Sequence, residues 1–170
     1  TVDGQGLSGV FYVVPPDPEW TLDTDVTISG LTIANASTDY QGGGVFQWRG
    51  ALTLRDCTLR NNYAREGGGA VFSHNGTLLI TGCTLMNNTT YVSMDDYYGG
   101  GAVAFRAVGI KGAFTLTTLT IENSLLTGNT APFGGAISIY VNGWEGFGES
   151  ELAIANATVT VTDSTLSDNS

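Results

Sequence analysis

The chain is short of charge, and above all of positive charge. Charged residues make up 13% of its 170 residues, with 6 Lys or Arg against 16 Asp or Glu, a formal net charge of -10. Proteins bind nucleic-acid backbones through clusters of basic side chains that release counterions, and this sequence has no such cluster. The composition therefore predicts that nucleic acid is not a partner.

Long apolar runs and catalytic motifs are also missing. No run approaches the roughly 18 apolar residues of a membrane-spanning helix, which predicts no direct membrane insertion. Neither a P-loop, nor zinc-ligand spacing, nor a Ser/His/Asp constellation occurs, so we expect no enzyme, no cofactor and no metal. Because Thr1 follows no initiator Met or apolar leader, we expect a processed protein or a fragment.

The sequence is instead rich in glycine, threonine and asparagine. There are 24 glycines, and hydrophobic residues make up 42%. β-branched residues suit the pleat of a strand, while Gly and Asn accept the positive φ of tight turns. The mixture predicts one all-β domain spanning residues 1–170, built from short strands.

An eleven-residue segment recurs along the chain. Its copies begin at Leu52, Leu78, Leu119 and Val159, and an older copy covers residues 26–36. The first, third and eighth positions are always Leu, Val or Ile, the pattern of side chains that point inward from strands. The fifth position is Gly, Asp or Asn, the residues that enter the left-handed region most cheaply, which predicts a corner.

The four later copies each end in asparagine: Asn62, Asn88, Asn129 and Asn169. An inward asparagine once per coil predicts a ladder that hydrogen-bonds the turn backbone and the asparagine of the next coil. A glycine pair then precedes a third strand, after loops of different length. Three faces of parallel strands about 4.8 Å apart account for this pattern, so we predict a right-handed parallel β-helix of roughly five coils.

The repeat resembles that of polymorphic outer-membrane proteins, which pairs Gly-Gly-Ala-(Ile/Leu/Val) with Phe-x-x-Asn. Gly134-Gly-Ala-Ile137 matches the first part, and the Leu-x-x-Asn units match the second with Leu in place of Phe. The opening Thr1-Val-Asp-Gly4 and residues 26–33 resemble the broader pectate-lyase-like β-helix superfamily. The first resemblance implies an adhesive or structural surface role, whereas the second superfamily includes many polysaccharide lyases and hydrolases.

Two hypotheses follow. The first is an extracellular structural or adhesive β-solenoid, a fragment or repeating unit that self-associates through its ends into a filament or cell-surface layer. The second is a carbohydrate-active or carbohydrate-binding β-helix, whose partners would be polysaccharides or cell-surface glycans. Loop aromatics are the candidates for stacking on sugar rings, with covering of the sheet or contact with a neighbouring subunit as the alternative: Tyr91, Tyr97, Tyr98, Phe133, Trp144 and Phe147.

Asn-X-Ser/Thr sequons predict a secreted glycoprotein at the cell surface or outside the cell, with chance meetings of Asn and Thr as the alternative. Because an inward Asn88 cannot also carry a glycan, the adjacent Asn87 is the better acceptor. The glycosylation candidates are Asn35, Asn75, Asn87 and Asn156.

Cys57 and Cys83 occupy the same column of adjacent coils. Their Cα atoms are expected about 4.8 Å apart, within disulfide range, although parallel Cβ vectors suit the bridge poorly. Both a disulfide and two stacked core thiols remain open.

The remaining chemical candidates each have a plainer structural interpretation. Asp95 and Asp96 are adjacent carboxylates for a calcium site or acid pair, but we expect a solvated loop. His74, the only histidine, is explained by turn chemistry. Arg106 and Lys111 lie in an apparent insertion over residues 106–116 and could neutralise an acidic sugar.

Overall fold

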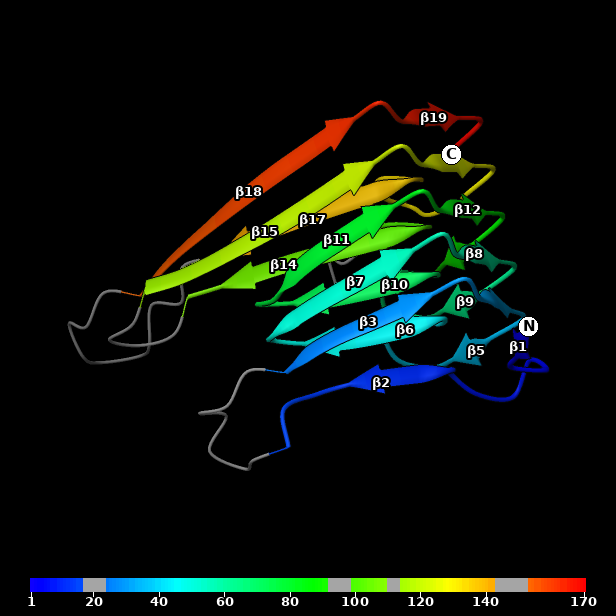
Figure 1. The fold of residues 1–170 in the computed structure, drawn as a ribbon, viewed down its shortest axis with the longest axis horizontal. Coiled ribbons are helices and arrows are strands. Elements are labelled where there is room, and N and C mark those ends of the chain that lie inside the picture. Colours follow the sequence, from blue (N-terminus) through cyan, green and yellow to red (C-terminus); the bar gives the residue numbers. More distant parts are fainter. Residues whose placement is uncertain (17–23, 92–98, 110–113, 143–152) are drawn as a thin grey trace.

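The structure is a computed structural model that describes residues 1–16, 24–91, 99–109, 114–142 and 153–170. Every regular element among these residues is a strand, and every strand pairing is parallel. The chain passes repeatedly through the same sheets, adding one strand to each per coil (Figure 1). The predicted fold, a right-handed parallel β-helix, is confirmed.

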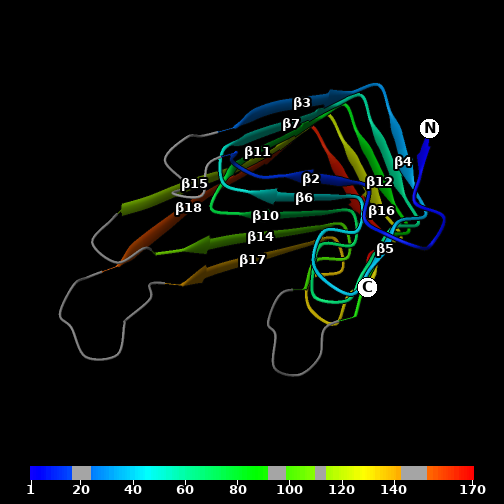
Figure 2. The ribbon, with the colours of Figure 1, turned by 90° about the horizontal axis from the view of Figure 1, so that it is seen from below.

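Three sheets form the walls of the solenoid, and a small fourth sheet lines one corner (Figure 2). Sheet A contains β1 (Val2–Asp3), β4 (Thr32–Ala34), β8 (Thr58–Arg60), β12 (Thr84–Met86), β16 (Leu125–Thr127) and β19 (Thr165–Ser167). Sheet B contains β2 (Phe11–Val13), β6 (Val45–Trp48), β10 (Val71–His74), β14 (Val103–Val108) and β17 (Ile137–Asn142). Sheet C contains β3 (Asp25–Ser29), β7 (Ala51–Arg55), β11 (Thr77–Thr81), β15 (Phe114–Glu122) and β18 (Ile154–Thr162).

Sheet D is the small fourth sheet, which the three-face prediction missed. It contains β5 (Ser37–Thr38), β9 (Tyr63–Ala64) and β13 (Thr89–Thr90). β9 and β13 directly follow the ladder residues Asn62 and Asn88, and β5 follows Ala36 at the same position. Two residues are too short for any periodicity in the sequence to reveal a strand.

The core is a set of apolar columns in strict register. In sheet C, Leu52 pairs with Leu78 and Leu78 with Leu119, and all three side chains are buried. Full burial of one such side chain contributes about 1.5–3 kcal/mol. A polar pair lies at the turn from sheet B to sheet C. The Ser73 hydroxyl donates to the side-chain oxygen of Gln47, whose amide donates to two turn carbonyls and to the carbonyl of the first residue of β11.

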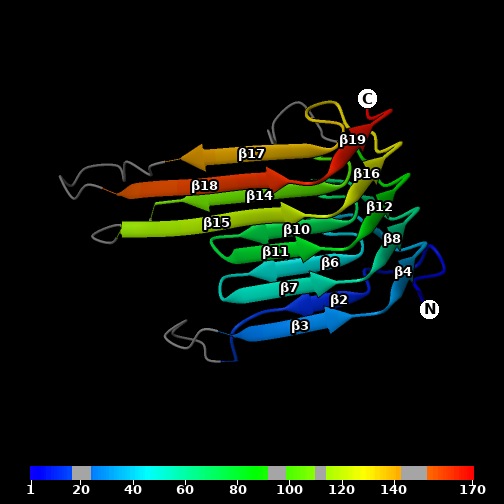
Figure 3. The ribbon, with the colours of Figure 1, turned by 45° about the horizontal axis from the view of Figure 1, so that its top comes forward.

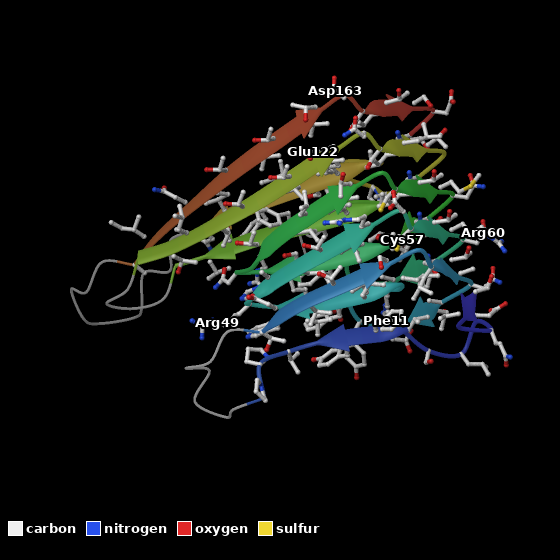
Figure 4. The ribbon with its side chains drawn as sticks, in the orientation of Figure 1. Phe11, Arg49, Cys57, Arg60, Glu122 and Asp163 are labelled. Atoms are coloured by element: carbon white, nitrogen blue, oxygen red, sulfur yellow. The ribbon has the colours of Figure 1, made fainter. Side chains whose placement is uncertain are left out.

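The predicted corner between sheets C and A is made by residues with positive φ. Figure 3 shows the sheet-C strands running into the short sheet-A strands at this corner, and Figure 4 places Asp163 there after β18. The φ angles are 66° at Gly30, 51° at Asp56, 63° at Gly82, 48° at Asn123 and 48° at Asp163. These residue types tolerate that region, so the sequence turns the chain once per coil at the same place.

The upper coils differ from the lower ones mainly in strand length. Arg106 and Leu116, expected in an insertion, lie in β14 and β15, which extend sheets B and C sideways. Tyr140 lies in β17 and Ala157 in β18, which are long strands of the same two sheets. The described residues of the expected insertion therefore lengthen strands of sheets B and C.

Candidate functional site

The asparagine ladder runs through the interior at the end of sheet A. The side-chain amide of Asn62 donates to Oδ1 of Asn88 at 3.0 Å, Asn88 donates to Asn129 at 2.9 Å, and Asn129 donates to Asn169 at 2.9 Å. Asn62, Asn88 and Asn129 are buried, and each also donates to a strand carbonyl of the preceding coil. These bonds satisfy polar groups at a turn that has no sheet partner of its own.

The ladder begins at Ala36, whose backbone N–H donates to Oδ1 of Asn62 at 3.0 Å. Every ladder side chain accepts a backbone N–H of the preceding coil in this way, so each coil is fastened to the next by the same pair of bonds. The ladder is a structural device rather than a ligand site.

A second ladder of thiols and hydroxyls lies at the corner between sheets C and A. The backbone N–H of Cys57 donates to Sγ of Cys83 at 3.4 Å, that of Cys83 to Oγ of Ser124, and that of Ser124 to Oγ of Ser164. The hydroxyl of Ser124 in turn donates to the carbonyl of Glu122 at 2.7 Å. Side chains of similar size thus perform the same task in four consecutive coils.

Cys57 and Cys83 are free, buried thiols in the structure. Of the two arrangements left open by the sequence, stacked core thiols are the one observed. Burial raises the pKa of the Cys83 thiol to about 11, which keeps it protonated and unreactive.

The outer face of sheet B carries a stack of aromatic side chains that the sequence analysis did not identify. Tyr12 lies flat on Phe46 with ring centroids 4.5 Å apart, and Phe46 lies on Phe72 at 5.6 Å. Phe46 and Phe72 are buried, whereas Tyr12 is 72% exposed. The signal was available, because each of these residues is the second residue of a sheet-B strand and they share one register column.

A hollow of about 560 Å³ opens beside the exposed end of this stack. Its walls include Tyr12 and Trp48 from sheet B and Tyr40 from the segment after β5. Tyr40 is 69% exposed, so aromatic surface lines the hollow from two sides. Exposed aromatic rings around a concavity can hold a flat, partly apolar ligand.

His74 lies next to the aromatic stack, in surroundings that oppose its protonation. Its ring stacks on Trp48 with centroids 4.0 Å apart, and its Nδ1 is buried without a hydrogen-bond partner. Burial, then the charges of Arg106 and Arg49, lower the pKa of His74 to about 4. A general base works best with a pKa near the working pH, and both neighbouring charges oppose protonation.

Other predicted candidates are scattered. Arg106 pairs in register with His74 and stands over the ring of Tyr140, 6.0 Å from its centroid. Tyr91 and Phe133 are exposed, while Asp95, Asp96, Tyr97, Tyr98, Lys111, Trp144 and Phe147 lie outside the described residues. Within the described ranges, no group of three or more His, Cys, Asp and Glu side chains is placed to hold a metal ion. The same part of the chain has no helix with the length and hydropathy to cross a membrane.

The four glycosylation candidates differ in their surroundings. Asn75 is fastened to β14, since its Nδ2 donates to the carbonyl of Val108 at 3.0 Å and its Oδ1 accepts the N–H of Val108 at 2.7 Å. Asn35 donates to the carboxylate of Asp3 at 3.1 Å. Asn87 and Asn156 are exposed. Only these last two side chains reach solvent without breaking a side-chain bond described here.

The last coil exposes positions that are core in the coils before it. Val161 is 41% exposed and Leu166 is 45% exposed, although both continue columns whose earlier members, Ile121 and Leu126, are fully buried. Ile139 at the end of sheet B is 48% exposed. These side chains, with the unpaired edges of β17, β18 and β19, form the upper end face of the solenoid.

Comparison with known proteins assigns a family. A family model described as a right handed beta helix region matches residues 20–170. No curated protein and no solved structure matches the chain.

Proposed function

Because the chain belongs to the right-handed β-helix family, we propose that it is an extracellular structural β-solenoid that assembles end to end. One observation supports this proposal: the inward columns of sheets A, B and C remain apolar as far as Leu166, Ile139 and Val161, so a further strand of the same pattern can continue each of them. A parallel strand edge with an apolar row beside it is a template for another strand. A second copy of the chain supplies such a strand.

The energetics favour covering this face. Val159 and Val161 are 36% and 41% exposed, and Ile139 and Leu166 are somewhat more exposed. Fully burying one such side chain contributes about 1.5–3 kcal/mol, so covering its remaining exposed part contributes about 1 kcal/mol to the free energy of association. Pairing the edges of β17, β18 and β19 adds backbone hydrogen bonds to this contribution.

An extracellular location agrees with the composition and the sequons. An acidic, weakly charged surface with exposed acceptor asparagines at Asn87 and Asn156 is typical of secreted proteins that carry glycans. The resemblance to outer-membrane protein repeats supports the same setting. Adhesion would then be a property of the assembled outer faces.

Sedimentation velocity and light scattering over a wide concentration range test the assembly. We expect species larger than the 17.8 kDa chain, increasing with concentration. Val161→Lys, which places a charge on the end face, should abolish them. Thr160→Lys is the matched control, because the neighbouring side chain points outward from the same strand and should leave assembly unchanged. A strictly monomeric chain at every concentration would overturn the proposal.

A second candidate function is carbohydrate binding in the hollow beside Tyr12. The ring of Tyr12 covers Phe46 with one face and is 72% exposed, so its other face can stack on a sugar ring. Tyr12→Ala should abolish retention on a polysaccharide panel that the unmodified chain binds. Leu116→Ala removes an apolar side chain of similar exposure, 66%, outside the hollow and serves as the control. Absence of any binding across the panel would refute this candidate.

A further inference from the structure

The outer face of sheet C presents columns of side chains that alternate with the buried leucines and isoleucines of the core. Most of the outward side chains on its three middle strands are threonine, which suits the solvent side of a strand. Three larger side chains interrupt these threonines: Arg55 on β7, Leu79 on β11 and Glu122 on β15. Figure 3 shows β11 as the middle strand of the sheet, with β7 and β15 on either side of it.

Arg55 and Glu122 are placed symmetrically about β11. Both are register partners of Thr81, so they lie one coil to either side of it in a single column. Adjacent strands are about 4.8 Å apart, which separates Arg55 from Glu122 by about 10 Å. Among the described residues, neither of these two side chains makes an ion pair. A column that holds opposite charges at equal distances from its centre is complementary to itself.

We propose that the outer face of sheet C binds the same face of a second copy of the chain, about a two-fold axis that runs along β11. A two-fold interface places one surface patch on itself, so that residue i contacts residue j and residue j contacts residue i. This axis exchanges the coil before β11 with the coil after it. Arg55 of each copy then lies opposite Glu122 of the other, and two ion pairs form. The inference goes beyond end-to-end assembly and does not depend on it, because it uses a side wall of the solenoid.

Leu79 lies on this axis. It is half-buried and is the one apolar side chain on the outer side of β11. The axis packs Leu79 of one copy against Leu79 of the other, while Thr53 of each copy lies opposite Thr120 of the other. An apolar contact at the centre with charged pairs beside it has the usual order of a protein interface, an apolar core and a polar rim.

The face also has a projection and a hollow that the axis brings together. Leu116 is 66% exposed, and a hollow of about 180 Å³ lies beside it with Gly50, Asn75 and Thr77 in its walls. Leu116 precedes Thr118 by two residues and Thr118 pairs with Thr77, so Leu116 lies level with Asn75 along the strands. The axis carries this level to the coil before β11. Leu116 of the second copy therefore lies over Gly50, where it can enter the hollow.

The charge of the chain restricts the face to this one arrangement. With a formal net charge of -10, two copies repel each other unless a contact brings opposite charges together. In the proposed arrangement Asp25 lies opposite Thr158, and Ser29 lies opposite Thr162, so no two carboxylates of these columns face each other. Sliding one copy by one coil would remove both ion pairs.

Exchanging the charges tests the pairing in the full chain. Arg55→Glu sets a carboxylate opposite Glu122, and Glu122→Arg sets a guanidinium opposite Arg55. We expect each single variant to dimerise at least about tenfold more weakly, and a chain with both substitutions to recover to within about threefold of the unmodified chain. Sedimentation velocity measures the monomer–dimer equilibrium. End-to-end contacts involve neither side chain, so species formed by that route should be the same in all variants.

Cross-linking locates the axis independently, should the charge variants fold poorly. Thr81 lies on the axis, so Thr81→Cys brings two thiols to facing positions on sheets that pack about 10 Å apart. We expect a bismaleimide of that length to link this variant into dimers. Thr84→Cys is the matched control, because Thr84 is also half-buried and belongs to the same coil but lies on sheet A. The two native thiols are buried.

Linked dimers of Thr81→Cys, together with recovery in the charge-exchanged chain, are the expected result. Equal linking of Thr81→Cys and Thr84→Cys, no linking of either, or a double variant as weak as the single ones would each overturn the sheet C interface. None of these outcomes bears on end-to-end assembly, which is tested separately by Val161→Lys.

Discussion

Removing the Asn88 side chain from the asparagine ladder should lower the stability of the fold by more than the loss of a few atoms would suggest. The Asn88 side chain is fully buried and makes four hydrogen bonds: its Oδ1 accepts two from Asn62, and its Nδ2 donates to the carbonyl of Leu59 and to Asn129. Asn88→Ala leaves the backbone N–H and one amide hydrogen of Asn62 buried without acceptors.

Each buried donor left unpaired costs about 1–3 kcal/mol, so Asn88→Ala should lower the free energy of unfolding by about 4 kcal/mol. That is a large part of the roughly 5–15 kcal/mol typical of a whole domain. Urea denaturation followed by circular dichroism, on protein made in a host that adds no glycan, measures the loss.

Asn169→Ala is the matched control. It removes the same side chain from a half-buried rung, where water can reach the groups it bonded, Asn129 and the carbonyl of Leu126. We expect a loss of about 1 kcal/mol or less. Equal losses for the two variants would refute the argument that buried, unreplaced hydrogen bonds make the ladder important.

Three further predictions concern single residues. The pKa of His74 is lowered to about 4 in the folded chain and is about 6.5 in the unfolded chain, so the unfolded chain takes up a proton first as the pH falls. The free energy of unfolding should therefore decrease between pH 6.5 and 4, by up to about 3 kcal/mol. His74→Phe should remove this pH dependence, measured by urea denaturation at each pH. Because Cys83 is buried and its pKa is raised, it should not react with thiol reagents until urea unfolds the chain. Mass spectrometry measures the labelling, and rapid labelling of the native protein would contradict this prediction. Gly82→Ala should lower the free energy of unfolding by about 1–2 kcal/mol, because φ at Gly82 is 63° and the side chain of Asp56 occupies the space that a Cβ would need. Thermal unfolding measures the change, and an unchanged midpoint would contradict this reasoning.

The coil was predictable because its determinants repeat. Leu52, Asp56 and Asn62 occupy fixed places in an eleven-residue pattern, and each place has one physical requirement: an inward apolar side chain, a positive φ, or a buried amide. Repetition across coils separates these requirements from chance. The two residues of each sheet-D strand carry no comparable pattern, so that sheet could not be predicted.

The outer aromatic stack was missed for a different reason. Phe46 and Phe72 follow glycine pairs in strands that were interpreted only through their inward side chains. On the outer face they form a separate apolar cluster with Ala104, against which Val14 and Trp48 pack. Trp48 and His74 are register partners in sheet B, and only the structure shows that their rings stack.

The ladder also aligns a row of side-chain amide dipoles along the axis of the solenoid. The side-chain amides of Asn62, Asn88 and Asn129 each donate to the asparagine of the coil that follows, and each Oδ1 accepts from the coil before, so these amide dipoles point the same way along the axis. The two ends of the ladder therefore differ: Oδ1 of Asn62 accepts the N–H of Ala36 at one end, and the amide of Asn169 donates back to the carbonyl of Leu126 at the other.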